Sequence, residues 1–130
     1  MSTKTCPLAA QIKIDVNTQY LHGRLPEEEE KYAFAYKIAI CNNGNEEVQL
    51  VNRYWLITDA NGKKTEVRGA GVVGEQPVIA AGQSFQYTSG AILDTPVGTM
   101  QGYYEMRCPN GDMFEAPIEV FGLAVPNVIN

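Results

Sequence analysis

The chain has 130 residues, a length typical of one domain, with 45% hydrophobic and 19% charged residues, as in ordinary globular proteins. Its net charge of −5 and pI near 4.8 argue against nucleic acid or an anionic membrane surface as a partner, because both attract basic proteins. No stretch reaches the ~20 apolar residues of a membrane span, and the N-terminus lacks the apolar run of a signal peptide. We expect one soluble domain over 1–130, with a core from about residue 10 to about 125 and a short flexible segment at each end.

The three cysteines are Cys6, Cys41 and Cys108. An odd number without close pairs is not the pattern of a disulfide framework. Cys41 and Cys108 fall on strand-like patterns and are expected to be small core residues. We therefore expect a reducing, cytoplasmic compartment.

Apolar residues recur at every second position along almost the whole chain, which predicts β-strands. Residues 12–17 form the first predicted strand, and a polar loop with the acidic run Glu27–Glu30 follows. The second strand, 32–41, places large apolar residues on one face and small ones on the other. The third, 48–59, contains the only tryptophan, Trp55, and ends at Asn61-Gly62, a strong hairpin signal.

The second half of the chain continues the pattern with shorter strands and frequent turn residues. The predicted strands cover residues 63–68, 78–79, 84–93, 99–108 and 114–120. Seven or eight short strands without a helical window are typical of a sandwich or barrel. We predict an all-β, immunoglobulin-like two-sheet β-sandwich.

Three runs, ITDANG, RGAGVVGEQP and FQYTSG, occur in this order, and with them the chain resembles the bacterial ApaG family over roughly residues 10–125. The resemblance implies a fibronectin-type-III-like β-sandwich. It also implies a link to cobalt resistance and magnesium efflux, which is compatible with an indirect effect. Similar domains in an F-box protein and in a polymerase-delta-interacting protein imply protein recognition. The family usually has RHW where this chain has Arg53-Tyr54-Trp55, so no role of that histidine carries over.

The family's glycine motif, for which pyrophosphate binding has been proposed, falls here on Gly69, Gly71 and Gly74. In dinucleotide-binding proteins GxGxxG opens a helix whose N-terminus receives the pyrophosphate, whereas here Pro77 and another strand follow. Backbone amides of the loop could still form an anion-binding nest, with Arg68 supplying positive charge. The structural alternative is a loop that needs positive φ at three points.

Cations are concentrated near this loop. Residues 53–68 contain four basic residues, Arg53, Lys63, Lys64 and Arg68, against Asp59 and Glu66, which makes a local charge of +2. They could neutralise an anionic ligand. Alternatively, the two lysines protect a strand edge from pairing with other molecules.

Residues for catalysis or metal binding are scarce. The only histidine, His22, lies in a polar loop and is expected to be a surface residue. The cysteines and His22 lack the close ligand pairs typical of zinc, and four consecutive glutamates are more typical of a solvated loop. We predict no catalytic residue, metal ligand or cofactor.

Tyr54 and Arg53 are candidates for a protein-binding surface, since Tyr and Arg are enriched in binding hot spots, while Trp55 is expected to be a core residue. We predict a non-catalytic binding module that recognises an unidentified protein. The alternative is a pyrophosphate- or nucleotide-like anion bound at Gly69–Gly74, and hydrolysis of such a molecule is a third, weaker reading. Nucleic acid and membranes are not expected as partners.

Overall fold

The computed structural model describes residues 11–22 and 31–126, and these form eight β-strands without an α-helix. The strands are β1 (Ile12–Tyr20), β2 (Tyr32–Asn42), β3 (Val48–Asp59), β4 (Lys64–Ala70), β5 (Val78–Ile79), β6 (Ser84–Leu93), β7 (Val97–Arg107) and β8 (Met113–Ala124). The third, fifth and sixth strands have the predicted bounds.

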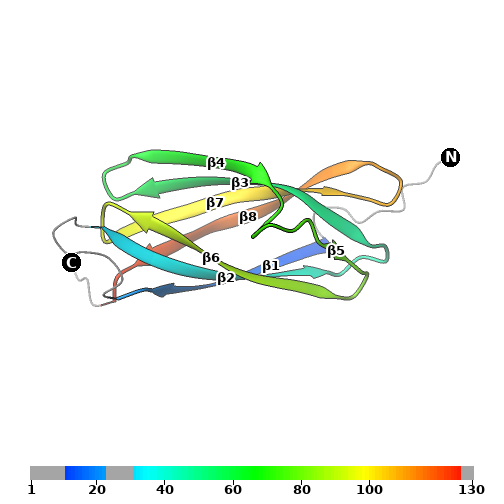
Figure 1. Cartoon of the computed structure of the whole chain (residues 1–130), viewed down its shortest axis with the longest axis horizontal. Helices are drawn as coiled ribbons and strands as arrows, with labels where there is room; N and C mark the ends of the chain where they lie inside the picture. Colours follow the sequence, from blue (N-terminus) through cyan, green and yellow to red (C-terminus); the bar gives the residue numbers. More distant parts are fainter. Residues whose placement is uncertain (1–10, 23–30, 127–130) are drawn as a thin grey trace.

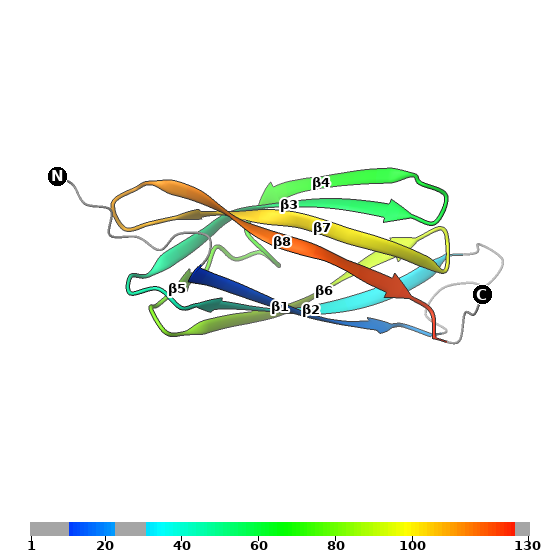
Figure 2. The same ribbon diagram turned by 180° about the vertical axis from the view of Figure 1, so that it is seen from behind.

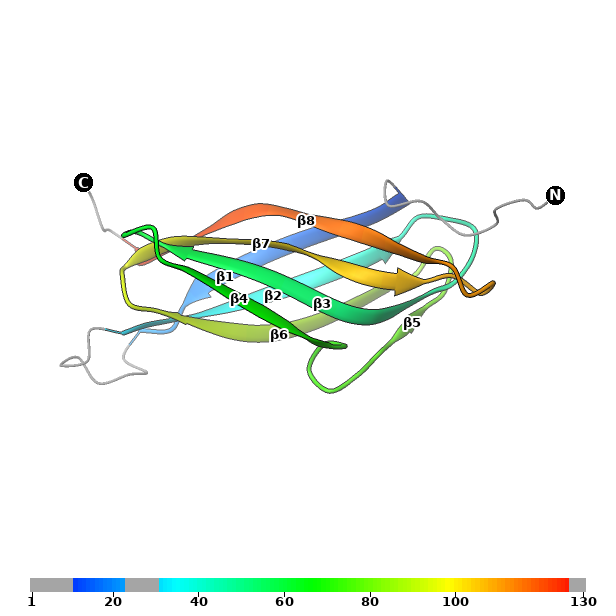
Figure 3. The ribbon, with the colours of Figure 1, turned by 90° about the horizontal axis from the view of Figure 1, so that it is seen from above.

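Two antiparallel sheets face each other. One has the strand order β1-β2-β6, and the other has the order β4-β3-β7-β8, with the short β5 paired to β3. Figures 1 and 2 show the two layers, and Figure 3 shows the strands of one sheet crossing above those of the other. The predicted all-β two-sheet sandwich is confirmed.

The core lies between the sheets, where alternate residues of each strand point inward. From β2 the buried side chains include Phe34, Ile38 and Ile40, on the face predicted from the sequence. Trp55 of β3 is 2% exposed, which confirms its predicted place in the core. Its ring lies edge-on to those of Tyr36 and Phe121, at centroid distances of 5.4 and 5.9 Å.

The cysteines depart from prediction. Cys108 is buried, which confirms its predicted place in the core, but it is disulfide-bonded, which the odd number and wide spacing of the cysteines did not predict. Spacing along the sequence does not show which cysteines meet in space. Cys41 is a free, half-buried thiol on the outer face of β2, and its sulfur accepts a hydrogen bond from the Ser84 hydroxyl at 3.1 Å.

Several predicted features fall on residues 1–10, 23–30 and 127–130, outside the described residues. They include Cys6, the acidic run Glu27–Glu30 and the two terminal segments expected to be flexible. Within 11–22 and 31–126, no helix is long and apolar enough to cross a membrane.

The Asn42 side chain links the turn between β2 and β3 to the end of β5. Its side chain is fully buried, and Nδ2 donates hydrogen bonds to the carbonyls of Glu46 and Ile79 at 2.8 and 3.0 Å. Its Oδ1 accepts a hydrogen bond from the Gly44 amide at 2.9 Å. Asn42 begins the run Asn42-Asn43-Gly44-Asn45, which is typical of a turn, but its interior position follows from the packing of β5 beside β3.

We predict that Asn42→Ala lowers the free energy of unfolding by about 2–3 kcal/mol, because two carbonyls and an amide lose their partner in a buried site. Urea denaturation measures the change. Asn43→Ala is the matched control, since Asn43 is exposed and its substitution should cost no more than about 0.5 kcal/mol. Equal losses in the two variants would contradict this account.

Candidate functional site

Strand β3 sends neighbouring residues to opposite faces of its sheet, as any strand does. Arg53 and Trp55 point between the sheets and line one pocket, whereas Tyr54 points outward. The side chains of the two predicted protein-binding residues, Arg53 and Tyr54, therefore leave β3 on opposite faces, and both residues also line a hollow of about 320 Å³ together with Arg68 and Gly69.

Arg53 is held against the glycine segment. Its Nη1 donates hydrogen bonds to the carbonyls of Ala70 and Gly71 at 3.1 and 2.8 Å. In the pairing of β3 with β4, Arg53 lies opposite Gly69, and a Cβ at residue 69 would come within 2.9 Å of the guanidinium carbon. Gly69 therefore permits the close approach of the arginine.

The rest of the glycine segment forms a tight turn. Val72 and Glu75 exchange backbone hydrogen bonds of 2.8 and 2.9 Å, and the two residues between them, Val73 and Gly74, have φ of 41° and 82°. Two successive positive φ values are typical of a type I′ turn. Gly71, at φ 65°, donates its amide to the Val51 carbonyl, where β3 has a register shift.

The prediction of positive φ at three glycines is correct for Gly71 and Gly74 and wrong for Gly69. Val73 adopts positive φ instead, which is a strained conformation for a β-branched residue. Among the described residues, the amides of Val73 and Gly74 have no acceptor, so these two groups are available for a potential anion contact.

A pocket of about 190 Å³ opens beside this turn, and we name it the Arg53 pocket. Its lining comes from both sheets and from the turn: Tyr36, Arg53, Trp55, Val72, Val73, Gly74, Tyr87 and Ser89. The sequence does not indicate Tyr36, Tyr87 and Ser89 as site residues, because they lie on strands β2 and β6 of the opposite sheet.

The hydroxyls in the pocket remain protonated at neutral pH. Burial raises the pKa of Tyr36, against smaller lowering effects of a hydrogen bond with Ser89 and of the Arg53 charge. Burial likewise raises the pKa of Tyr87, whose hydroxyl shares a hydrogen bond with that of Tyr104. The pocket thus presents one cation and neutral hydroxyl groups.

A second cluster lies on the outer face of the larger sheet, and we name Arg68, Tyr54, Tyr103 and Glu66 the Tyr54 patch. Cross-strand pairing aligns Arg68 of β4, Tyr54 of β3 and Tyr103 of β7. The Arg68 guanidinium carbon lies 4.3 Å from the centre of the Tyr54 ring, and this ring stacks on Tyr103 at 5.0 Å. The Tyr54 hydroxyl donates to Glu66 at 2.6 Å, which raises the pKa of Tyr54.

The structure therefore regroups the predicted site residues. Arg68 was expected beside the glycines, but it lies over Tyr54 on the outer face. Arg53, expected beside Tyr54, lies against Gly69 instead. The reason is strand register, which pairs Arg53 with Gly69 and Tyr54 with Arg68.

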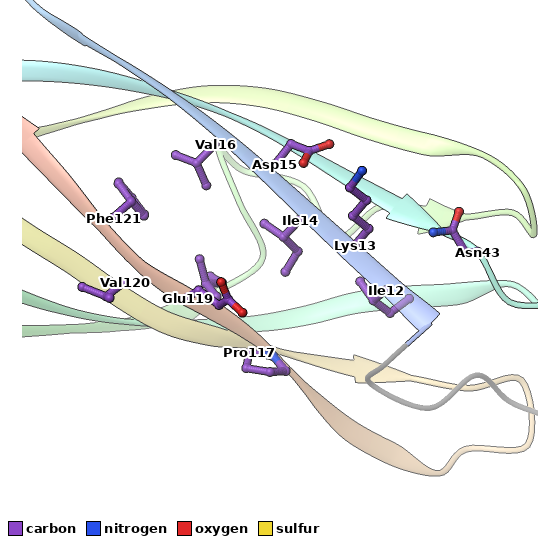
Figure 4. Close-up of a pocket in the computed structure, with 11 residues that line it drawn as sticks. Ile12, Lys13, Ile14, Asp15, Val16, Asn43, Pro117, Glu119, Val120 and Phe121 are labelled. Atoms are coloured by element: carbon purple, nitrogen blue, oxygen red, sulfur yellow. The ribbon is translucent and has the colours of Figure 1, made fainter.

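A larger hollow, of about 650 Å³, separates the edge strands β1 and β8 of the two sheets. Figure 4 shows Ile12 and Ile14 projecting from β1 toward β8, while Lys13 and Asp15 project away. The β8 edge is poorly suited to added strands, because Pro117 lacks an amide hydrogen and the register shifts nearby.

Within the described part of the chain, no group of three or more His, Cys, Asp or Glu side chains could hold a metal ion. His22 is exposed beyond the end of β1, and its ring contacts Tyr20 at a centroid distance of 5.9 Å.

Comparison with known proteins identifies the family. Residues 23–108 match the model of the ApaG domain family. The chain belongs to this family. It is 51% identical to protein ApaG of Shewanella piezotolerans over 119 residues, which cover 92% of this chain and 94% of the relative. Protein ApaG of Salmonella arizonae is 52% identical over 120 residues, with coverage of 92% and 96%.

A solved structure agrees with this assignment. The X-ray structure of a structural genomics target superposes with a TM-score of 0.90 at 47% identity, and the match covers 95% of this chain and 93% of the other. The resemblance to the ApaG family that the three sequence runs indicated is confirmed.

We predict that Gly71→Ala is more destabilising than Gly74→Ala. A Cβ at residue 71 would lie 2.1 Å from the Glu75 carbonyl oxygen, whereas a Cβ at residue 74 would meet nothing within 4 Å. Both residues have positive φ, which costs an alanine about 1–2 kcal/mol, and overpacking adds about 1–3 kcal/mol at residue 71. Thermal or urea unfolding compares the variants. A Gly71→Ala protein as stable as Gly74→Ala would show that the turn differs from the one described.

Proposed function

We propose that this ApaG domain is a non-catalytic binding module that recognises a protein through the Tyr54 patch. The observation that carries the proposal is the row of Arg68, Tyr54 and Tyr103 across three strands on an outer sheet face. Tyr and Arg are the residue types that dominate binding hot spots.

The patch is already assembled in the free protein. Tyr54 is fixed between Arg68 and Tyr103, and its hydroxyl is bound to Glu66. Because these side chains are ordered before binding, the domain loses less conformational entropy when a partner docks. A rigid aromatic and cationic surface suits a protein better than a small molecule, since the hollow beside Tyr54 is lined by strands of one sheet only, so the other sheet does not enclose a ligand there.

The disulfide at Cys108 removes the cysteine argument for a cytoplasmic location, so the proposed interaction is not assigned to a compartment. If this proposal holds, the effects on cobalt resistance and magnesium efflux that are associated with the family arise through the partner protein and not through metal bound by the domain.

Site-directed photocrosslinking in cells tests the proposal. A photoreactive residue at Gln101, exposed on β7 and opposite Leu56, should capture a protein. The same residue at Thr88, exposed on the outer face of β6 in the other sheet, is the matched control and should capture none. Tyr54→Ala should weaken binding of the captured protein by about 30-fold, the effect of losing a hot-spot contact of about 2 kcal/mol.

Capture that is equal at the two positions, or that persists unchanged in Tyr54→Ala and Arg68→Ala, would contradict recognition through this face. The melting temperature of each variant must stay near that of the unchanged protein, because the stacked row also contributes to sheet stability.

A second candidate function is binding of a pyrophosphate-like anion at Gly69–Gly74. It is supported by the unpaired amides of Val73 and Gly74 beside the cationic Arg53. Backbone amides of this kind can bind anions without a helix.

Pyrophosphate titration followed by NMR tests this alternative. The amides of Val73 and Gly74 should shift, Arg53→Gln should weaken the effect, and added salt should reduce it because exposed charge is screened. Arg68→Ala should have no effect, since Arg68 lies over Tyr54 on the other face. Shifts scattered over Lys63 and Lys64 would show only nonspecific attraction.

A further inference from the structure

Arg53 carries a charge that no carboxylate neutralises within the described residues. Asp94 forms ion pairs with Lys31 and Lys63 at 2.6 and 3.5 Å, and no carboxylate of residues 11–22 and 31–126 lies within ion-pair distance of Arg53. The arginine is half-buried, so less water is available to solvate it than at an exposed site. An anionic partner stabilises a cation in such a position, because the charge is otherwise left uncompensated at a half-buried site.

Part of the guanidinium is free to bind one. Nη1 is occupied by the carbonyls of Ala70 and Gly71, while Nη2 and Nε have no acceptor among the described residues. Packing against Gly69 fixes the plane of the group. Nη2 and Nε form one edge of the planar fork that binds a carboxylate through two parallel hydrogen bonds.

The pocket is sized for one small group. Its volume of about 190 Å³ lies below the roughly 300–1,000 Å³ of sites that enclose small-molecule ligands. It offers a single cation, which balances one carboxylate, together with the hydroxyls of Tyr36 and Ser89. Val73, 54% exposed, adds an apolar rim that a residue of a polypeptide can contact beyond its carboxylate.

We propose that the Arg53 pocket binds the carboxylate of an acidic side chain from the protein partner. This inference rests on the proposed function and identifies a chemical feature of the partner. Edge strand β4 pairs Gly69 with Arg53 and Arg68 with Tyr54, so a partner segment crossing this edge reaches both the pocket and the Tyr54 patch.

Two capped peptides that differ only in a central glutamate or glutamine test the proposal. Trp55, the only tryptophan, lines the pocket and reports binding through its fluorescence, while the Arg53 Nε–H resonance reports the contact by NMR. The glutamate peptide should bind at least ten times more tightly than the glutamine peptide. Arg53→Gln should abolish the difference, and Arg107→Gln, the matched control at an exposed arginine outside the pocket lining, should preserve it.

Equal binding of the two peptides to the unchanged protein would overturn the proposal, and this comparison requires no variant to fold. Acetate binding as tightly as the glutamate peptide would assign the pocket to free small acids, and tighter binding of inorganic phosphate would assign it to phosphate. Either result would overturn it as well.

The outcomes also separate this inference from the proposed function. If crosslinking at Gln101 depends on Tyr54 but the two peptides bind alike, protein recognition stands and the carboxylate pocket fails. If the peptides are distinguished through Arg53 while no protein is captured at Gln101, the pocket stands and recognition through the Tyr54 patch fails.

Discussion

The packing of Trp55 between the sheets positions everything else at the site. Its ring lies edge-on to Tyr36 of the smaller sheet and to Tyr104 and Phe121 of its own. Because strand residues alternate, an inward Trp55 requires an outward Tyr54 and an inward Arg53. The inward packing of Trp55 therefore determines that Arg53 and Tyr54 project from opposite faces of β3, one toward the Arg53 pocket and the other toward the Tyr54 patch.

The glycine segment is part of the core as well as part of the Arg53 pocket. Val72 is 1% exposed, and the Gly71 amide binds the Val51 carbonyl where β3 shifts register. A structural requirement for these glycines is thus compatible with ligand binding at the same turn. The strained Val73 is held there because the hydrogen bonds between Val72 and Glu75 close the turn around it.

Net charge is a poor guide to the local chemistry of this protein. The chain is acidic, at −5, yet Arg53 and Arg68 lie on the two faces of one strand pair. Arg68 is stabilised by the Tyr54 ring and hydrogen-bonds Tyr103, which raises the pKa of its guanidinium. Arg53 donates to two carbonyls and shares its pocket with tyrosine and serine hydroxyls, but no described carboxylate pairs with it. Two arginines that look alike in the sequence are therefore suited to different roles.

Local patterns in the sequence were enough to predict the strands, the two-sheet sandwich and the inward Trp55, because alternation and turn chemistry act between near neighbours. They could not predict that Arg53 meets Gly69, that Arg68 covers Tyr54, or that Tyr36 and Tyr87 complete the pocket. The disulfide at Cys108 was missed for the same reason. These contacts depend on strand register and on how the two sheets pack against each other. Both are determined by packing between residues that are far apart in the chain.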